Sequence, residues 1–168
     1  MNATRDAIEA VLRKLPFAAD WPDGTISQVA ALAEHASFPA GAVIFHEGDE
    51  HEAIQFVLEG RVALEMSVPA RGRIRLLTLS PGDLLGWSPL VGNREMTATA
   101  VALEDVRLLK ISGSALLALC DRNHDIGFAV MQRLAGALAR RLSATRLQLL
   151  DLYSHSAPLV MAVATGKA

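Results

Sequence analysis

Residues 38–64 read FPAGAVIFHEGDEHEAIQFVLEGRVAL, in which short β-prone runs alternate with glycine. The runs are AVIF at 42–45, AIQFVLEG at 53–60 and RVALEM at 61–66. The same texture continues in RIRLLTL at 73–79 and VRLLKI at 106–111. Short strands at this spacing, separated by turn residues, predict an antiparallel barrel or jelly roll.

The segment before these strands has a helical period. Residues 3–36 predict short helices, separated by Pro16 and by the Trp-Pro-Asp-Gly turn at 21–24. Two apolar stripes carry this prediction: Ile8, Val11, Leu12 and Leu15, then Ile26, Val29, Ala30, Leu32 and Ala33.

The last third of the chain is also helical in pattern. Ser112 or Ser114 can cap a short helix, and Asn123 can cap a much longer one. The longer helix carries a heptad seam, which predicts a partner helix and hence a homodimer: Phe128, Met131, Ala135, Leu138, Leu142, Thr145, Leu149 and Leu152. The alternative is one broad apolar face packed on the same domain. A second stripe is expected to lie against the barrel: Val130, Leu134, Ala137 and Arg141.

These patterns predict a single, mainly β domain with flanking helices. Its expected parts are an N-terminal helical cap at 1–37, a β jelly roll at 38–112, a short and a long helix at 113–153, and a C-terminal tail at 154–168. A chain of 168 residues with 51% hydrophobic residues has ample material for one core.

Composition excludes several classes of function. The net charge of −2 provides no global field for nucleic acid, and the single cysteine, Cys120, excludes a disulfide or a four-thiolate cluster. No export signal or membrane span is visible, so we expect a cytoplasmic protein without membrane contact.

The cluster His46-Glu47-Gly48-Asp49-Glu50-His51 contains transition-metal ligand types. A cupin-like metal enzyme using His46, Glu47 and His51 is therefore an alternative. However, the five-residue spacing places the two histidines on opposite faces of a continuous strand. We expect a solvated turn, with no metal, no cofactor and no catalytic residue.

The chain resembles the cyclic-nucleotide-binding domain of the Crp/Fnr regulators. Four segments carry the resemblance: residues 38–64, LTLSPGDLLGW at 77–87, TATAVALEDVRLLKIS at 97–112, and LARRLSAT at 138–145. The resemblance implies an eight-stranded jelly roll with a ligand pocket inside it, and dimerisation along the last helix.

The phosphate-binding cassette departs from the family pattern. The family's glycine is Gly86, but Trp87 stands where a glutamate holds the ribose, followed by Ser88. Met96 stands where an arginine pairs with the phosphate, and Thr97 and Ala98 follow as the family expects. Arg94 is a substitute cation, and Thr145 lies where the family directs a hydroxyl toward the base. These positions are the candidate ligand-binding residues.

Too few residues follow Tyr153 for a winged helix-turn-helix, so we expect no sequence-specific DNA binding. The sequence predicts a stand-alone, non-enzymatic regulatory domain that does not take cyclic AMP or cyclic GMP in the standard way. It is expected to bind another small molecule and to signal as a dimer to a separate protein partner. The alternative is a ligand-free scaffold in which Trp87 and Met96 fill the pocket.

Overall fold

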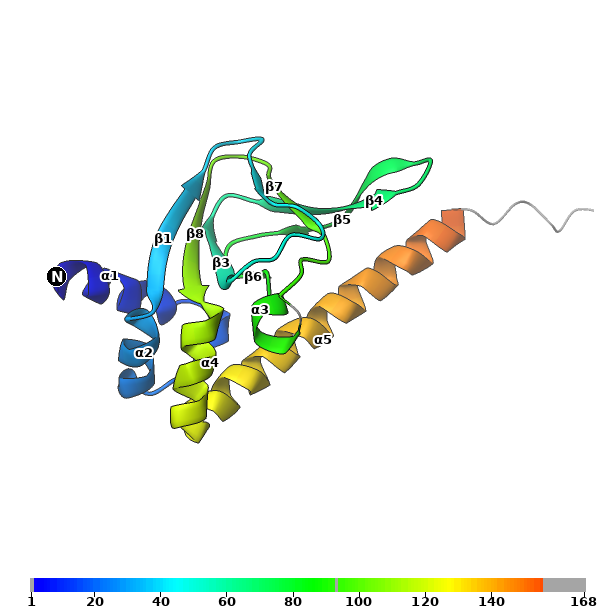
Figure 1. Ribbon diagram of the computed structural model, residues 1–168. Helices are drawn as coiled ribbons and strands as arrows, with labels where there is room; N and C mark the ends of the chain where they lie inside the picture. Colours follow the sequence, from blue (N-terminus) through cyan, green and yellow to red (C-terminus); the bar gives the residue numbers. More distant parts are fainter. Residues whose placement is uncertain (1, 93, 156–168) are drawn as a thin grey trace, which may run out of the picture.

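The computed structural model describes residues 2–92 and 94–155 (Figure 1). In chain order the elements are α1 (Asn2–Leu12), the short 3-10 helix η1 (Pro16–Ala18), α2 (Asp23–Ala30), β1 (Ala33–Phe38), β2 (Val43–Phe45), β3 (Ala53–Glu59), β4 (Val62–Val68), β5 (Gly72–Leu79), β6 (Leu84–Leu85), α3 (Ser88–Val91), β7 (Thr99–Ala102), β8 (Val106–Ser112), α4 (Gly113–Arg122) and α5 (His124–His155).

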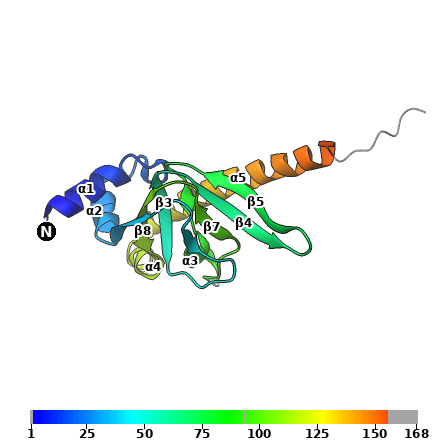
Figure 2. The same cartoon turned by 90° about the horizontal axis from the view of Figure 1, so that it is seen from above.

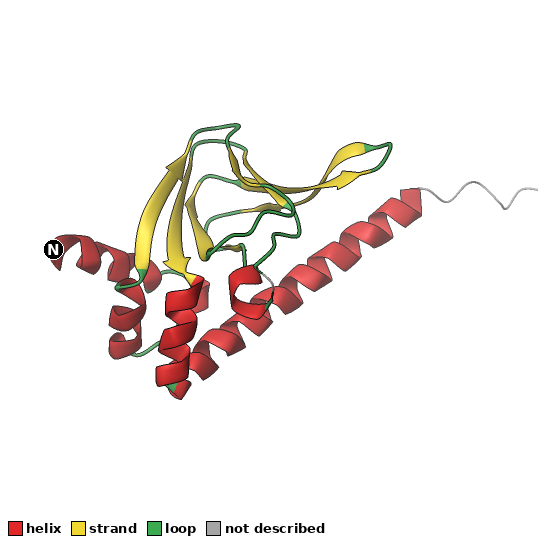
Figure 3. Ribbon diagram, viewed as in Figure 1, coloured by secondary structure: helices red, strands yellow, loops and turns green. Residues whose placement is uncertain are grey.

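The eight strands of the described residues form two antiparallel sheets (Figure 3). One sheet has the order β1-β8-β3-β6, and the other has the order β2-β7-β4-β5. Neighbours in the sheets are mostly distant in sequence, as a jelly roll requires. The predicted fold class, an antiparallel β roll with flanking helices and a long C-terminal helix, is therefore confirmed.

The first strand was not predicted. The sequence analysis places residues 33–37 in the helical cap, yet α2 ends at Ala30 and β1 pairs along its whole length with β8. Its sequence, AEHASF, contains no β-branched residue, so the strand rests on backbone pairing with β8 rather than on intrinsic propensity.

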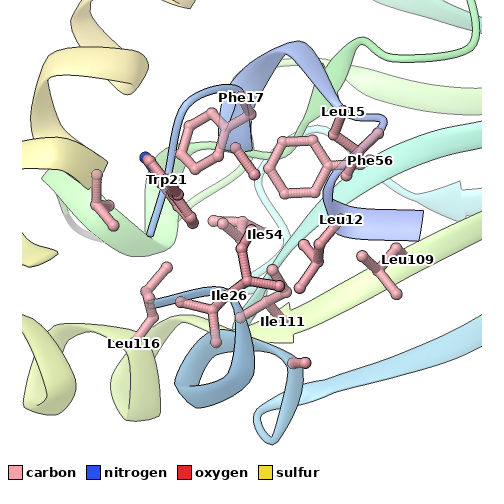
Figure 4. Close-up of a cluster of buried hydrophobic side chains, with 14 of the residues drawn as sticks. Leu12, Leu15, Phe17, Trp21, Ile26, Ile54, Phe56, Leu109, Ile111 and Leu116 are labelled. Atoms are coloured by element: carbon pink, nitrogen blue, oxygen red, sulfur yellow. The ribbon is translucent and has the colours of Figure 1, made fainter. Parts of the chain in front are cut away.

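Two apolar clusters lie on opposite faces of the β1-β8-β3-β6 sheet. The outer cluster joins β3 and β8 to the helices (Figure 4). The inner cluster fills the space between the two sheets. Side chains of β3 alternate between them, because Ile54 and Phe56 belong to the outer cluster and Val57 to the inner one.

Two capping residues start the C-terminal helices. The Ser112 hydroxyl accepts a hydrogen bond from the Ala115 amide, and the Asn123 side chain accepts one from the Ile126 amide. Both satisfy amides that a helix start leaves unpaired, as the sequence predicted.

Helix α5 has a buried and an exposed apolar face. Val130 and Leu134 are fully buried in the outer cluster, as predicted for the second stripe. The seam residues Phe128 and Leu142 are instead 70% and 53% exposed, so at these positions the seam does not pack on its own domain. The side chains of Leu149 and Leu152 lie outside the described residues. The distal part of α5 extends away from α1 and α2 (Figure 2).

Gly60, between β3 and β4, lies where the neighbouring backbone leaves no room for a side chain. It has φ +77°, and a Cβ there would lie 2.4 Å from the Asp105 carbonyl oxygen. Gly72 has a similar φ of +73°, but no atom lies within 4 Å of the place that a Cβ on Gly72 would take.

We expect Gly60→Ala to lower the free energy of unfolding by about 3 kcal/mol, from backbone strain together with the collision. Gly72→Ala should cost only the strain, about 1–2 kcal/mol. Chemical denaturation of both variants checks this difference, and equal losses would contradict the close packing at Gly60.

Candidate functional site

The cassette begins at Gly86, directly after β6. Gly86 has φ +69°, and a Cβ there would lie 3.7 Å from a Phe45 ring carbon and 3.8 Å from the Met96 sulfur. The two ends of the cassette therefore meet inside the roll, where Phe45 and Met96 belong to the inner cluster.

Met96 is only 3% exposed. Its backbone is fixed by the turn after β2, because the Gly48 amide donates to the Met96 carbonyl at 2.8 Å and the Met96 amide donates to the Asp49 carbonyl at 2.9 Å. An apolar side chain thus occupies the position at which the family resemblance implies a phosphate-binding arginine.

The other cassette residues have different environments. Ser88 and Ala98 are buried, whereas Thr97 is exposed. Arg94 is exposed, with φ +63°, and its guanidinium lies 3.9 Å from the Glu52 carboxylate. The Thr145 hydroxyl donates to the Arg141 carbonyl within α5 at 2.9 Å.

Trp87 does not fill the roll, contrary to the scaffold hypothesis. It is half-buried and packs against the outer cluster. There it borders a cavity of about 350 Å³ between the roll and α5. The cavity is also lined by Phe17, Phe56, Thr78, Leu138 and Arg141. Since Gly86 turns the chain just before Trp87, the indole lies on the helix side of the sheet.

The sequence analysis placed Arg141 against the barrel but gave it no part in the site. Its guanidinium donates to the Leu84 carbonyl, one residue before the end of β6, and so joins α5 to the start of the cassette. Burial lowers the pKa of the Arg141 guanidinium, while the nearby Asp83 carboxylate opposes this shift. The helical period indicated its burial, but nothing local in the sequence indicated its partner.

A polar pair was also missed. Gln55 is 1% exposed and shares a strand face with Val57 of the inner cluster. Its amide nitrogen lies 2.6 Å from Nε2 of His51, and its amide oxygen has no hydrogen-bond partner within the described part of the chain. Burial and the Lys110 ammonium lower the pKa of the His51 imidazole, whereas Asp49 and Glu52 raise it.

The hypothesised metal site is not assembled. His51 is engaged with Gln55, and the Glu47 carboxylate accepts a hydrogen bond from the Ser67 amide. Over residues 2–92 and 94–155, no group of three or more histidine, cysteine or acidic side chains is arranged to hold a metal ion. The Gly48 turn separates His46 from His51, which explains why adjacency in sequence did not produce a cluster. Nor does any helix among these residues have the length and apolar character to cross a membrane.

Comparisons with known proteins agree with this geometry. The cyclic AMP receptor protein of Thermus thermophilus is 38% identical over 117 residues, which cover 70% of this chain and 52% of that relative. A structure of a protein from Geobacter metallireducens, described as cyclic nucleotide-binding, has a TM-score of 0.72 at 30% identity, covering 80% of this chain and 97% of the other.

A third neighbour is the regulatory subunit of a cAMP-independent protein kinase A from Trypanosoma cruzi, bound to guanosine. Its TM-score is 0.64 at 22% identity, covering 68% of this chain and 41% of the other, which shows a shared fold alone. This chain spans about half the length of the curated relatives that it matches.

The sequence pattern of the cyclic nucleotide-binding domain matches residues 35–123, which is more than half of the chain. This range contains both sheets except the first residues of β1, together with the whole cassette and α4. The protein therefore belongs to the cyclic nucleotide-binding domain family.

Proposed function

We propose that this protein is a non-enzymatic regulatory domain that senses a small molecule other than a standard cyclic nucleotide. The observation that carries the proposal is the burial of Met96 among apolar side chains beside Gly86. A cyclic phosphate at this position would lose its hydration without gaining a guanidinium partner.

The size of this loss supports the proposal. Removing one partner of a buried, hydrogen-bonded charge pair costs about 2–5 kcal/mol. That corresponds to roughly 30- to 5000-fold in affinity. Arg94 is a poor substitute, because its exposed side chain lies near Glu52 and would have to leave the surface to reach the roll interior.

The cavity beside Trp87 is the proposed ligand site. Its volume of about 350 Å³ suits a small organic molecule, and the indole offers a face for stacking. Arg141 gives one donor to the Leu84 carbonyl and keeps others that can reach neutral oxygen or ring-nitrogen acceptors of a ligand. We therefore propose a ligand with a planar ring and neutral hydrogen-bond acceptors, such as a nucleoside, a class that the same fold holds in the Trypanosoma cruzi neighbour.

We further propose that α5 transmits the signal as the interface of a homodimer. Phe128, Met131 and Leu142 present an apolar strip along α5 that a lone domain leaves in water. A ligand beside Trp87 would act on the Arg141–Leu84 hydrogen bond and shift the population of helix orientations. A separate protein partner would read this change.

Isothermal titration tests the ligand class. We expect neither cyclic AMP nor cyclic GMP to bind at micromolar concentration, whereas guanosine or adenosine gives measurable heat. Met96→Arg should gain at least about 30-fold in affinity for a cyclic nucleotide, because it restores the phosphate partner. Met96→Leu is the matched control and should behave like the unaltered protein.

Micromolar binding of cyclic AMP to the unaltered protein would overturn the proposed ligand class. Failure of every nucleoside and cyclic nucleotide to bind would instead favour the ligand-free scaffold, with Met96 as a core residue.

Sedimentation velocity tests the dimer. Leu142→Glu places a charge in the exposed seam and should weaken dimerisation at least about tenfold, since an unpaired charge at an interface core is costly. Leu147→Glu is the control, because Leu147 is 64% exposed on the same helix but lies outside the heptad seam. A monomer at all concentrations, or equal effects of both substitutions, would contradict the proposed interface.

A further inference from the structure

A second cavity adjoins the first along α5, toward η1. Its volume is about 620 Å³, and its walls come from α5, from the η1 segment and from the turn between β5 and β6. We call it the η1 groove. It shares Pro16, Phe17, Gly82, Asp83 and Arg140 with the cavity beside Trp87, so the two cavities adjoin, but neither Trp87 nor any other cassette residue lines the η1 groove.

Two arginines, about two turns apart on α5, supply positive charge to the η1 groove. Arg140 has no hydrogen-bond or ion-pair partner within the described residues. Arg133 uses only its Nη2 atom, which donates to the Ala19 carbonyl and to the Asp20 carboxylate. A guanidinium carries five N–H donors, so both side chains retain unused donors.

Gly136 lies between these arginines and keeps the groove open. A Cβ on Gly136 would meet only Nη1 of Arg140, at 3.5 Å, so packing within the described chain does not require glycine there. Glycine inside a helix costs about 1 kcal/mol relative to alanine. The absence of a side chain at Gly136 leaves the space beside the Arg140 guanidinium open.

The wall of the η1 groove opposite the arginines determines which ligand body fits beside the acid group. Pro16 and Pro81 carry no N–H group, and Phe17 offers an aromatic ring, so this wall favours an apolar body. The acids beside the groove are Asp83 and Asp20. Asp20 pairs with Arg133, and Asp83 accepts from the Ser80 amide while also facing Arg141. These two carboxylates offset most of the positive charge of the arginines. The groove therefore favours a ligand with one negative charge over a ligand with two.

We propose that the η1 groove binds a small organic carboxylate, with its acid group on Arg140 and its apolar body against Phe17 and the two prolines. Such a ligand bridges α5 to η1 and to the β5–β6 turn. It is therefore a second effector site on the helix that carries the exposed seam, next to the cavity beside Trp87, and Gly136 and Arg133 line only this second site.

The test uses 1-naphthoate, with the neutral 1-naphthamide and the dianionic 1-naphthyl phosphate as comparison ligands. Titrations of the full chain are followed by heteronuclear NMR at the amides of Gly82 and Gly136. We expect 1-naphthoate to bind at least about tenfold more tightly than 1-naphthamide, because the carboxylate forms an ion pair with the Arg140 guanidinium that the neutral amide cannot form. The dianion should bind no better than 1-naphthoate.

Three variants test whether the acid group lies on Arg140 and whether the ligand occupies the space beside Gly136. Arg140→Gln should abolish the preference for the acid, whereas Arg146→Gln, an exposed site on the same helix outside the groove, should retain it. Gly136→Leu should block both ligands while preserving the fold, since leucine is the better helix former. Equal binding of acid and amide, no binding of 1-naphthoate, the same loss in both arginine variants, or undiminished binding to Gly136→Leu would overturn the proposal.

Discussion

Burial of β3 on both faces is the constraint on which the rest of the structure depends. Phe56 packs outward against the Phe17 ring, with centroids 4.9 Å apart, and so fixes η1. Val57 packs inward, while its amide and carbonyl hold the β5–β6 turn through Asp83 and Gly82. One strand therefore positions the helices, the roll interior and one wall of each cavity beside α5. Any change in β3 must affect all three together.

Much of this arrangement was readable from the sequence. Glycine-separated β-prone runs predicted β2, β3, β4, β5 and β8, because local turn chemistry and alternation act over a few residues. The two stripes of α5 separate only in part: Val130 and Leu134 are buried and Phe128 and Leu142 are exposed, but Leu138, predicted in the exposed seam, packs against the outer cluster. The prediction failed for β1, where the helix-like run through Ala33 gave way to backbone pairing with a strand more than sixty residues distant.

The site was harder to predict for the same physical reason. That Met96 replaces a phosphate-binding arginine stays a prediction from the sequence; the structure shows that Met96 is buried. The direction of the Trp87 side chain depends on the positive φ of Gly86. The hydrogen-bond partner of Arg141 is the Leu84 carbonyl on β6, 57 residues away in sequence. The orphaned amide oxygen of Gln55 likewise arises from its enclosure by several strands. Long-range contacts of this kind leave no local pattern.

The geometry of α5 has a mechanical consequence. Its 32 residues extend for about 48 Å at 1.5 Å per residue. Among the residues whose side chains the structure describes, Arg141 makes the last hydrogen bond from α5 to the roll, and roughly 20 Å of helix follows it. In the signalling that we propose, this distal portion acts as a lever arm with Arg141 at its pivot. A tilt of about 10° there would displace the far end by roughly 4 Å over that length. A small movement at the hydrogen bond between Arg141 and Leu84 would thus become a displacement of the far end of α5 comparable to the length of a side chain.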